Sequence, residues 1–282
     1  MNAKDDKRPE PKPRKHPRLW QAYLWWDELM QMRKRHLLRL SSIEHEKSNM
    51  DAQFELSMME AMRLDALVDP GNKAERAFSP ETVLMLEGEQ LGDVWKWITS
   101  IRGMKAGGLA AQVLAQIDDP GKFATISKLW RFSGYAVIDG EIEHRQKGEK
   151  APFNARLKSI VYLVVDQFIK QQTPVYSDLY YAEKERQRVL HPEPICKECG
   201  GACKSKKNGD GHTVYRCIEC GGMANFTDAH IHNRAIRKVA RVFLQHLWLV
   251  WRESEGLPVS KPWIIEHGGH ADYIVPPGWP LS

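Results

Sequence analysis

The sequence predicts a mainly helical fold that carries one small inserted β module. Two long stretches, residues 19–67 and 229–252, contain strong helix formers with apolar side chains at helical spacing and no proline or glycine. Four cysteines, in two CxxC pairs that are each followed by two glycines, lie just before the second stretch. We therefore expect helices along most of the chain and short strands only around these cysteines.

Composition excludes several classes of protein. The chain has 282 residues, 42% hydrophobic and 27% charged, enough for one substantial core or two modest ones. No apolar run reaches the roughly 20 residues of a membrane-spanning helix, and the first 18 residues lack the apolar centre of a secretory signal. CxxC pairs favour metal binding in a reducing compartment over disulfides. We expect a cytoplasmic protein without a membrane partner.

Positive charge is concentrated in three regions, although the net charge is only +5. Residues 1–18, 122–158 and 191–252 have an excess of Lys and Arg, whereas residues 19–121 are acidic. Charge runs are usually solvated faces, but Lys and Arg clusters are also the electrostatic footprint of phosphate-backbone binding. Three such regions favour a polyanionic partner.

The chain is predicted to have six segments. Residues 1–18 contain four prolines among alternating charges and are predicted to be a disordered basic arm. Residues 19–68 are predicted to form coiled-coil-like helices without a clean heptad, through which a homodimer is one alternative. The others are a helical domain (79–190), an inserted cysteine module (191–228), a closing basic helix of that domain (229–252) and an irregular tail (253–282).

Within the helical domain, a helix is predicted from Pro80 to Ile101. The glycine-rich segment 101–108 then leads into helices over 109–117 and 123–132. This order resembles a helix-hairpin-helix module, in which glycines let backbone amides approach a phosphate. An ordinary packing corner is the alternative.

The rest of the domain is predicted from breaks and periodicity. Residues 139–153 are polar and predict a loop. The helix from Ala155 is apolar nearly all round and is expected to be buried, whereas residues 175–190 predict an amphipathic helix.

The cysteine spacing predicts a zinc ribbon. Cys196, Cys199, Cys217 and Cys220 follow the pattern C-x2-C-x17-C-x2-C. Four thiolates fill a tetrahedral site, so we expect structural Zn²⁺. The role of Cys203 stays open, and His212 is an alternative ligand. An HNH-type nuclease is a weaker alternative: Asp228 to Asn233 (DAHIHN) follows the second knuckle, but no downstream Asn and His complete a metal site.

Three segments together resemble a known family. IRGMKAGGLAAQVLAQIDDPGKFATISKLWRFSGYA, NARLKSIVYLVVDQFI and AHIHNRAIRKVARVFLQHLW are similar, in this order, to the C-terminal half of bridge-RNA-guided insertion-sequence recombinases of DEDD type. The resemblance covers residues 85–252, interrupted by the ribbon, and departs at Met104-Lys105 and in the hairpin length. That half is related to the Nop domain of box C/D ribonucleoproteins and to the Tas proteins of tandem-interspaced-guide-RNA systems. It implies a Nop-like fold and a prokaryotic or phage origin.

The departures from the family bear on catalysis. The family's RuvC-like domain with its acidic metal ligands is not found before the coiled-coil-like region. The family's serine nucleophile also has no counterpart between Ser133 and Ser159, and Ser159 is expected inside a buried helix. The resemblance therefore implies a non-catalytic protein that binds a small guide RNA and targets DNA by RNA base pairing.

We expect phosphate contacts from three groups of side chains, and the closing helix also offers its N-terminal dipole. The candidates are Lys128, Arg131, Lys147, Lys150, Arg156 and Lys158; Lys204, Lys206, Lys207 and Arg216; and His230, His232, Asn233, Arg234, Arg237, Lys238 and Arg241. Helix capping is the alternative role of His230, and Trp130 and Tyr135 either stack on a base or are buried.

Two other functions stay open. One is a transposase-derived recombinase or nuclease component that acts on DNA, with a separate catalytic chain or an unrecognised site. The other is a DNA-binding regulator whose helix-hairpin-helix grips the duplex without RNA.

Overall fold

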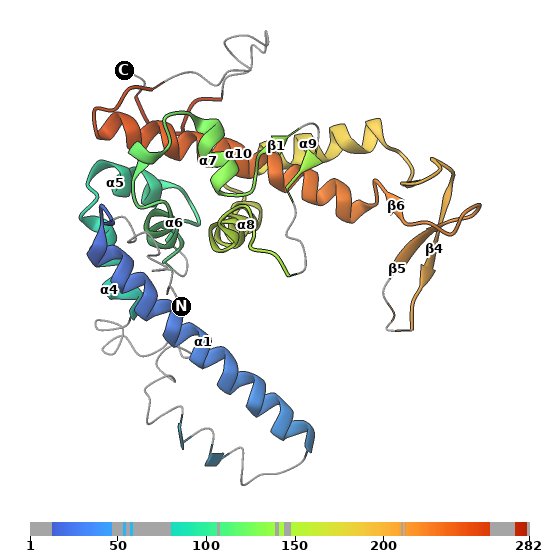
Figure 1. The fold of residues 1–282 in the computed structure, drawn as a ribbon, viewed down its shortest axis with the longest axis horizontal. Helices are drawn as coiled ribbons and strands as arrows, with labels where there is room; N and C mark the ends of the chain where they lie inside the picture. Colours follow the sequence, from blue (N-terminus) through green and yellow to red (C-terminus); the bar gives the residue numbers. More distant parts are fainter. Residues whose placement is uncertain are drawn as a thin grey trace, which may run out of the picture. The chain divides into compact units, whose positions relative to one another are not determined.

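The computed structural model describes residues 13–46, 53–54, 57–58, 80–105, 108–138, 141–143, 148–209, 211, 213–259 and 274–280. The chain divides into two compact units. The first comprises residues 1–96 and 106–122, and the second comprises residues 97–105 and 123–282. The described part is mainly helical, as predicted (Figure 1). No described helix has the length and apolar character needed to cross a membrane.

The first unit is built on α1 (Pro17–Glu46), which packs against α4 (Pro80–Glu89) and α6 (Leu109–Ile117). The last residues of the predicted arm belong to this unit. The Arg14 guanidinium lies 3.4 Å from the centre of the Trp20 ring, and the His16 N–H donates to Asp118. The predicted disordered arm is therefore wrong for residues 13–18. Residues 1–12 and most of 47–79 lie outside the described residues.

The helix predicted from Pro80 to Ile101 is in fact two helices, α4 and α5 (Asp93–Ser100). Gly92 adopts a φ of +63°, a left-handed conformation that glycine reaches without strain. The Gly92 N–H donates to the carbonyl of Glu89, which closes the end of α4. A single glycine at a helix end thus breaks an apolar periodicity that continues across it.

The helix that follows the glycine-rich segment, α6, begins against other helices of the protein. Every residue of α6 is buried, including Gln112 and Gln116. A Cβ atom placed on Gly108 would lie 3.5 Å from the Leu84 side chain, so α4 covers the start of α6. The first turn of α6 therefore contacts protein rather than facing a ligand. The short 3-10 helix η3 (Pro120–Lys122) follows.

The second unit is organised around α10 (Asp228–Ser254), which packs against α7 (Ile126–Phe132), α8 (Ala155–Lys170) and α9 (Tyr176–Leu190). Phe168, Tyr176 and Phe243 form an aromatic cluster at the centre of this core. Figure 1 shows α9 and α10 side by side, with the ribbon at one end of the pair.

Two expectations for this unit are wrong. Helix α8 is buried along one face only: Ser159, Tyr162 and Leu163 are exposed, and the Ser159 hydroxyl donates to the Ala155 carbonyl in its own helix. The predicted loop over 139–153 includes a short strand, β2 (Glu141–Ile142), which pairs with β1 (Val137–Ile138) just before the loop.

The predicted ribbon is present as two antiparallel strand pairs. Strand β3 (Ile195–Cys196) pairs with β6 (Ala224–Asn225), and the longer β4 (Cys203–Lys207) pairs with β5 (Thr213–Cys217). The tail is irregular where it is described, but residues 274–280 are docked on the helical core. His246 Nε2 lies 2.8 Å from the Ile274 carbonyl, and the Trp97 indole N–H donates to the Pro277 carbonyl.

Candidate functional site

Four cysteine sulfurs converge at the base of the ribbon. The Sγ atoms of Cys196, Cys199, Cys217 and Cys220 lie within 4.8 Å of one another, with two pairs at 3.4 Å. Four thiolates at the usual Zn–S distance of about 2.3 Å form a tetrahedron with edges of about 3.8 Å, whereas a disulfide requires about 2.05 Å. The four cysteines can therefore hold one metal ion and are not paired as disulfides.

Two near-identical knuckles supply these sulfurs. In the first, the Cys196 N–H donates to the Gly201 carbonyl at 2.9 Å, and the Glu198 N–H points at the Cys196 sulfur at 3.4 Å. Gly200 turns the chain with a φ of +73°. The second knuckle repeats both contacts at the same distances. Repeated turns with inward N–H groups are suited to stabilising thiolate ligands.

The thiol pKa values show why the cluster suits a cation. Backbone N–H donors lower the pKa of Cys196, and they lower that of Cys217 to about 7. The Gly222 N–H also lowers the pKa of Cys220, but the neighbouring thiols together raise it to about 12. Without a metal the four groups share protons, because four adjacent thiolates would repel one another. A divalent cation removes this conflict.

Other candidate ligands do not join the cluster. The Cys203 sulfur lies 3.8 Å from the Gly201 carbonyl and outside the four-sulfur group. His212 lies outside the described residues. His230 caps α10, with Nδ1 3.0 Å from the Thr227 hydroxyl, and His232 Nδ1 is 2.7 Å from the Tyr180 hydroxyl. Both histidines of the weaker nuclease alternative thus have structural partners in the helical core.

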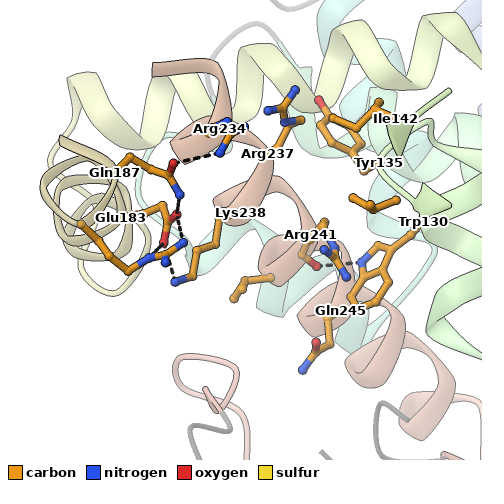
Figure 2. A pocket seen from close by; sticks show the side chains of 13 residues that line it. Trp130, Tyr135, Ile142, Glu183, Gln187, Arg234, Arg237, Lys238, Arg241 and Gln245 are labelled. Carbon is orange, nitrogen blue, oxygen red and sulfur yellow. Dashed lines mark hydrogen bonds and ion pairs between the residues drawn. The ribbon is translucent and has the colours of Figure 1, made fainter. Parts of the chain in front are cut away.

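A basic groove lies between α9 and α10, closed at one end by α7 and the β1–β2 hairpin. Its volume is about 760 Å³. Figure 2 shows its side chains converging from these elements. Five basic residues and one acid line it: Arg186, Arg234, Arg237, Lys238, Arg241 and Glu183. Four of these cations were predicted from the sequence, and they share one face of α10 because they recur every three or four residues.

The side chains of two cations in the groove have no hydrogen-bond acceptor and no ion-pair partner among the described residues. Arg237 makes no hydrogen bond or ion pair there, and burial followed by the charge of Arg234 lowers its pKa. The buried Nε of Arg241 lacks an acceptor, and burial lowers the pKa of this guanidinium as well. Partly desolvated guanidinium groups without counter-charge favour binding of an anion.

Glu183 holds the other cations in place. Its carboxylate is 4% exposed and accepts hydrogen bonds from Arg186, Gln187 and Lys238. These donors outweigh burial and lower the pKa of Glu183 to about 2. Arg234 extends the network by donating to the Gln187 side chain at 3.1 Å. One buried carboxylate therefore fixes the α9 side of the groove without neutralising it.

The α7 end of the groove is aromatic. The Trp130 indole N–H donates to the Arg241 carbonyl at 3.0 Å, and the Arg241 guanidinium lies 4.2 Å from the centre of the Trp130 ring. The Tyr135 hydroxyl donates to the Lys158 carbonyl at 3.0 Å. Both rings are largely buried, yet both line the groove.

The remaining predicted cations are spread over other surfaces. Lys128 and Lys150 are exposed, and Arg131 lies 3.8 Å from the Glu143 carboxylate. Lys158 covers the Phe153 ring, and its pKa is lowered by burial and by Arg237. Arg156 is half-buried and Asn233 is exposed; neither is among the groove residues. Lys147 lies outside the described residues.

The ribbon hairpin separates its basic residues onto two faces. Lys204 pairs with Arg216, and Lys206 pairs with Val214, so these four side chains share one face. Lys207 points to the other face with Ser205. All four predicted cations of the hairpin are exposed. One face therefore carries three of them.

An aromatic stack joins the ribbon to the groove. The His191 and Phe226 rings are parallel, with centres 3.6 Å apart, and the Arg234 guanidinium lies 4.6 Å from the Phe226 ring centre. Arg234 thus touches both the base of the ribbon and the groove network. Sequence analysis missed this stack, together with Glu183, Arg186 and Gln187. The spacing of these three on α9, at i, i+3 and i+4, was the available signal.

Comparisons with protein-family profiles, with curated proteins and with solved structures each return no match for this chain.

Proposed function

We propose that this protein is a non-catalytic nucleic-acid-binding protein that holds single-stranded guide RNA in the basic groove. The observation that carries the proposal is the pair of partly buried guanidinium groups, Arg237 and Arg241, whose side chains have no hydrogen-bond acceptor and no ion-pair partner among the described residues. Arg186, Arg234 and Lys238 add charge around them. RNA is favoured over other polyanions because aromatic side chains beside an arginine cluster are typical of sites for unpaired bases.

The guide role comes from the resemblance of residues 85–252 to the RNA-binding half of bridge-RNA-guided recombinases and to Tas proteins. In this proposal the RNA addresses DNA by base pairing, and the ribbon hairpin contacts nucleic-acid backbone through Lys204, Lys206 and Arg216. The four cysteines hold structural Zn²⁺, because four thiolates leave no coordination position for a reacting water.

The first experiment asks what nucleic acid the protein carries. The full chain, expressed with its genomic surroundings, is expected to co-purify with a discrete small RNA and to lose specific DNA binding after RNase treatment. DNA binding that survives RNase would instead establish the RNA-independent regulator. Cleavage of DNA by the purified protein in the presence of Mg²⁺ would establish the nuclease alternative.

The second experiment tests the groove. The Arg237→Gln/Arg241→Gln variant is expected to bind a mixed-sequence single-stranded RNA about 10- to 100-fold more weakly than wild type. Loss of two phosphate contacts should reduce the slope of log K against log salt by about 1.4. The double variant Lys96→Gln/Lys170→Gln removes two exposed cations outside the groove and is the charge-matched control. Equal binding by both variants would reject the groove as the RNA site, and thermal unfolding checks that both are folded.

A further inference from the structure

The two ends of the groove differ in chemistry. Cations and the Glu183 network occupy the end formed by α9 and the first turns of α10. The other end contains Trp130 and Gln245, and Arg241 lies between them and the cations (Figure 2). Val242, the residue after Arg241, also lines the groove. A charged end beside an apolar and aromatic end matches the two halves of a nucleotide, which are its phosphate and its base.

Arg241 has the geometry of a stacking platform. Its guanidinium lies over the Trp130 ring, and the Trp130 indole N–H is bonded to the Arg241 backbone carbonyl, so the two side chains hold each other in position. Its Nε has no acceptor among the described residues. A planar guanidinium backed by an indole can stack on an unpaired base with its other face.

Gln245 lines the groove one helical turn beyond Arg241. Its side-chain amide makes no hydrogen bond within the described structure and offers both donors and an acceptor, as base recognition requires. Val137 and Ile142 add apolar surface to the groove from the β1–β2 hairpin. The volume of about 760 Å³ falls in the range of pockets that enclose one small molecule, and a duplex is far too wide to enter.

We propose that the Trp130–Arg241–Gln245 end of the groove is a nucleobase subsite, which takes one unpaired base stacked on Arg241 while the phosphate of the same nucleotide lies against Arg234 and Arg237. This inference rests on the proposed RNA-binding function and gives it a stoichiometry of one extruded nucleotide per groove. Gln245 selects among bases, and Arg241 holds whichever base is present.

Wild-type protein, freed of co-purified RNA and kept loaded with zinc, is titrated calorimetrically with the four nucleoside 5′-monophosphates, with ribose 5-phosphate and with inorganic phosphate. At least one nucleotide should bind about tenfold more tightly than ribose 5-phosphate, because stacking adds to the phosphate contact. Arg241→Lys retains the positive charge but removes the planar guanidinium group. It should erase most of the preference for a nucleotide over ribose 5-phosphate and leave phosphate binding in place. Gln245→Leu should reduce the differences among the four nucleotides, and Lys170→Gln should behave as wild type.

The outcomes separate this inference from the function on which it rests. Tight binding of single-stranded RNA with no preference for nucleotides over ribose 5-phosphate would overturn the base subsite and leave the RNA-binding function intact. If polyglutamate binds as tightly as RNA and no nucleotide binds, both proposals are wrong. The preference measured on wild type needs no variant, so a folding defect in Arg241→Lys does not decide the result.

Discussion

The cysteine cluster and the basic groove are both assemblies of like-charged groups, but the protein holds them together in different ways. The four sulfurs lie within 4.8 Å of one another in a module of short strands with few buried side chains. The groove cations project from long helices whose opposite faces form an apolar core. Removal of a metal ion from the four cysteines should therefore unfold the ribbon, whereas the groove should keep its shape without a bound anion. We therefore expect the cysteine module to need a metal ion in order to fold, and the groove to need a bound anion only for the proposed function.

The largest expected effect comes from breaking the cluster. The double variant Cys196→Ser/Cys217→Ser should lose its zinc and unfold residues 191–226, because binding of structural zinc supplies about 10–16 kcal/mol to domains of this kind. Helical content should change little, since the described residues of the ribbon form strands and turns and no helix. Elemental analysis measures the zinc content, which should be about one zinc per wild-type chain. Hydrogen exchange of the ribbon amides measures whether the ribbon is folded.

Cys203→Ser is the matched control for this variant, because its sulfur lies outside the cluster on the same hairpin. It should keep full zinc content. Zinc loss in this control would make Cys203 a ligand, and retention of ordered ribbon amides in the double variant would show that the ribbon does not depend on metal.

The second-largest effect is expected from Glu183, the buried carboxylate of the groove. Glu183→Gln should lower the free energy of unfolding by about 1–3 kcal/mol at neutral pH, because it removes the buried negative charge beside Arg186 and Lys238 and replaces one acceptor oxygen with an NH2 donor. The same change removes the negative charge from the groove and should strengthen RNA binding several-fold at low salt. On one preparation, denaturant titration should show a lower free energy of unfolding, and an RNA-binding titration should show a higher affinity.

The pH dependence gives Glu183 a separate signature. Its pKa is lowered to about 2 in the folded state, so the folded protein binds fewer protons here than the unfolded chain does between about pH 4.5 and pH 2. The stabilisation is complete above this window and is lost as the pH falls through it. The stability difference between wild type and Glu183→Gln should shrink over the same range. A difference that stays constant over this range would mean that the groove does not lower the pKa of Glu183.

Sequence succeeded where the determinants are local. The four cysteine ligands follow from spacing alone, and the bounds of α10 follow from helical periodicity with a Thr227 cap, within two residues of the prediction. It failed where one local residue overrides periodicity, as Gly92 does between α4 and α5. It also failed at α8, where apolar composition concealed the exposed face that carries Ser159.

Sequence analysis could predict the α10 side of the groove but not which residues of α9 and α7 face it. Arg234, Arg237, Lys238 and Arg241 form a visible basic stripe on one helix, whereas Glu183 meets Lys238 across 55 residues of sequence. Pairing of α9 with α10 depends on their apolar faces, and the sequence of either helix alone does not specify which polar residues then become neighbours. Trp130 and Arg241 come together in the same way, across 111 residues.

The smallest effect tests whether the ribbon takes part in nucleic-acid binding. Lys206 and Lys207 are consecutive, exposed residues of β4 that point to opposite faces of the hairpin. Lys206 shares its face with Lys204 and Arg216, so Lys206→Ala should weaken RNA binding about two- to threefold and reduce the salt slope by about 0.7. Lys207→Ala removes the same charge from the other face and should have a smaller effect. Equal effects would mean that the ribbon acts only through its net charge, and equally strong binding by both variants and wild type would leave the α9–α10 groove as the RNA contact without the ribbon.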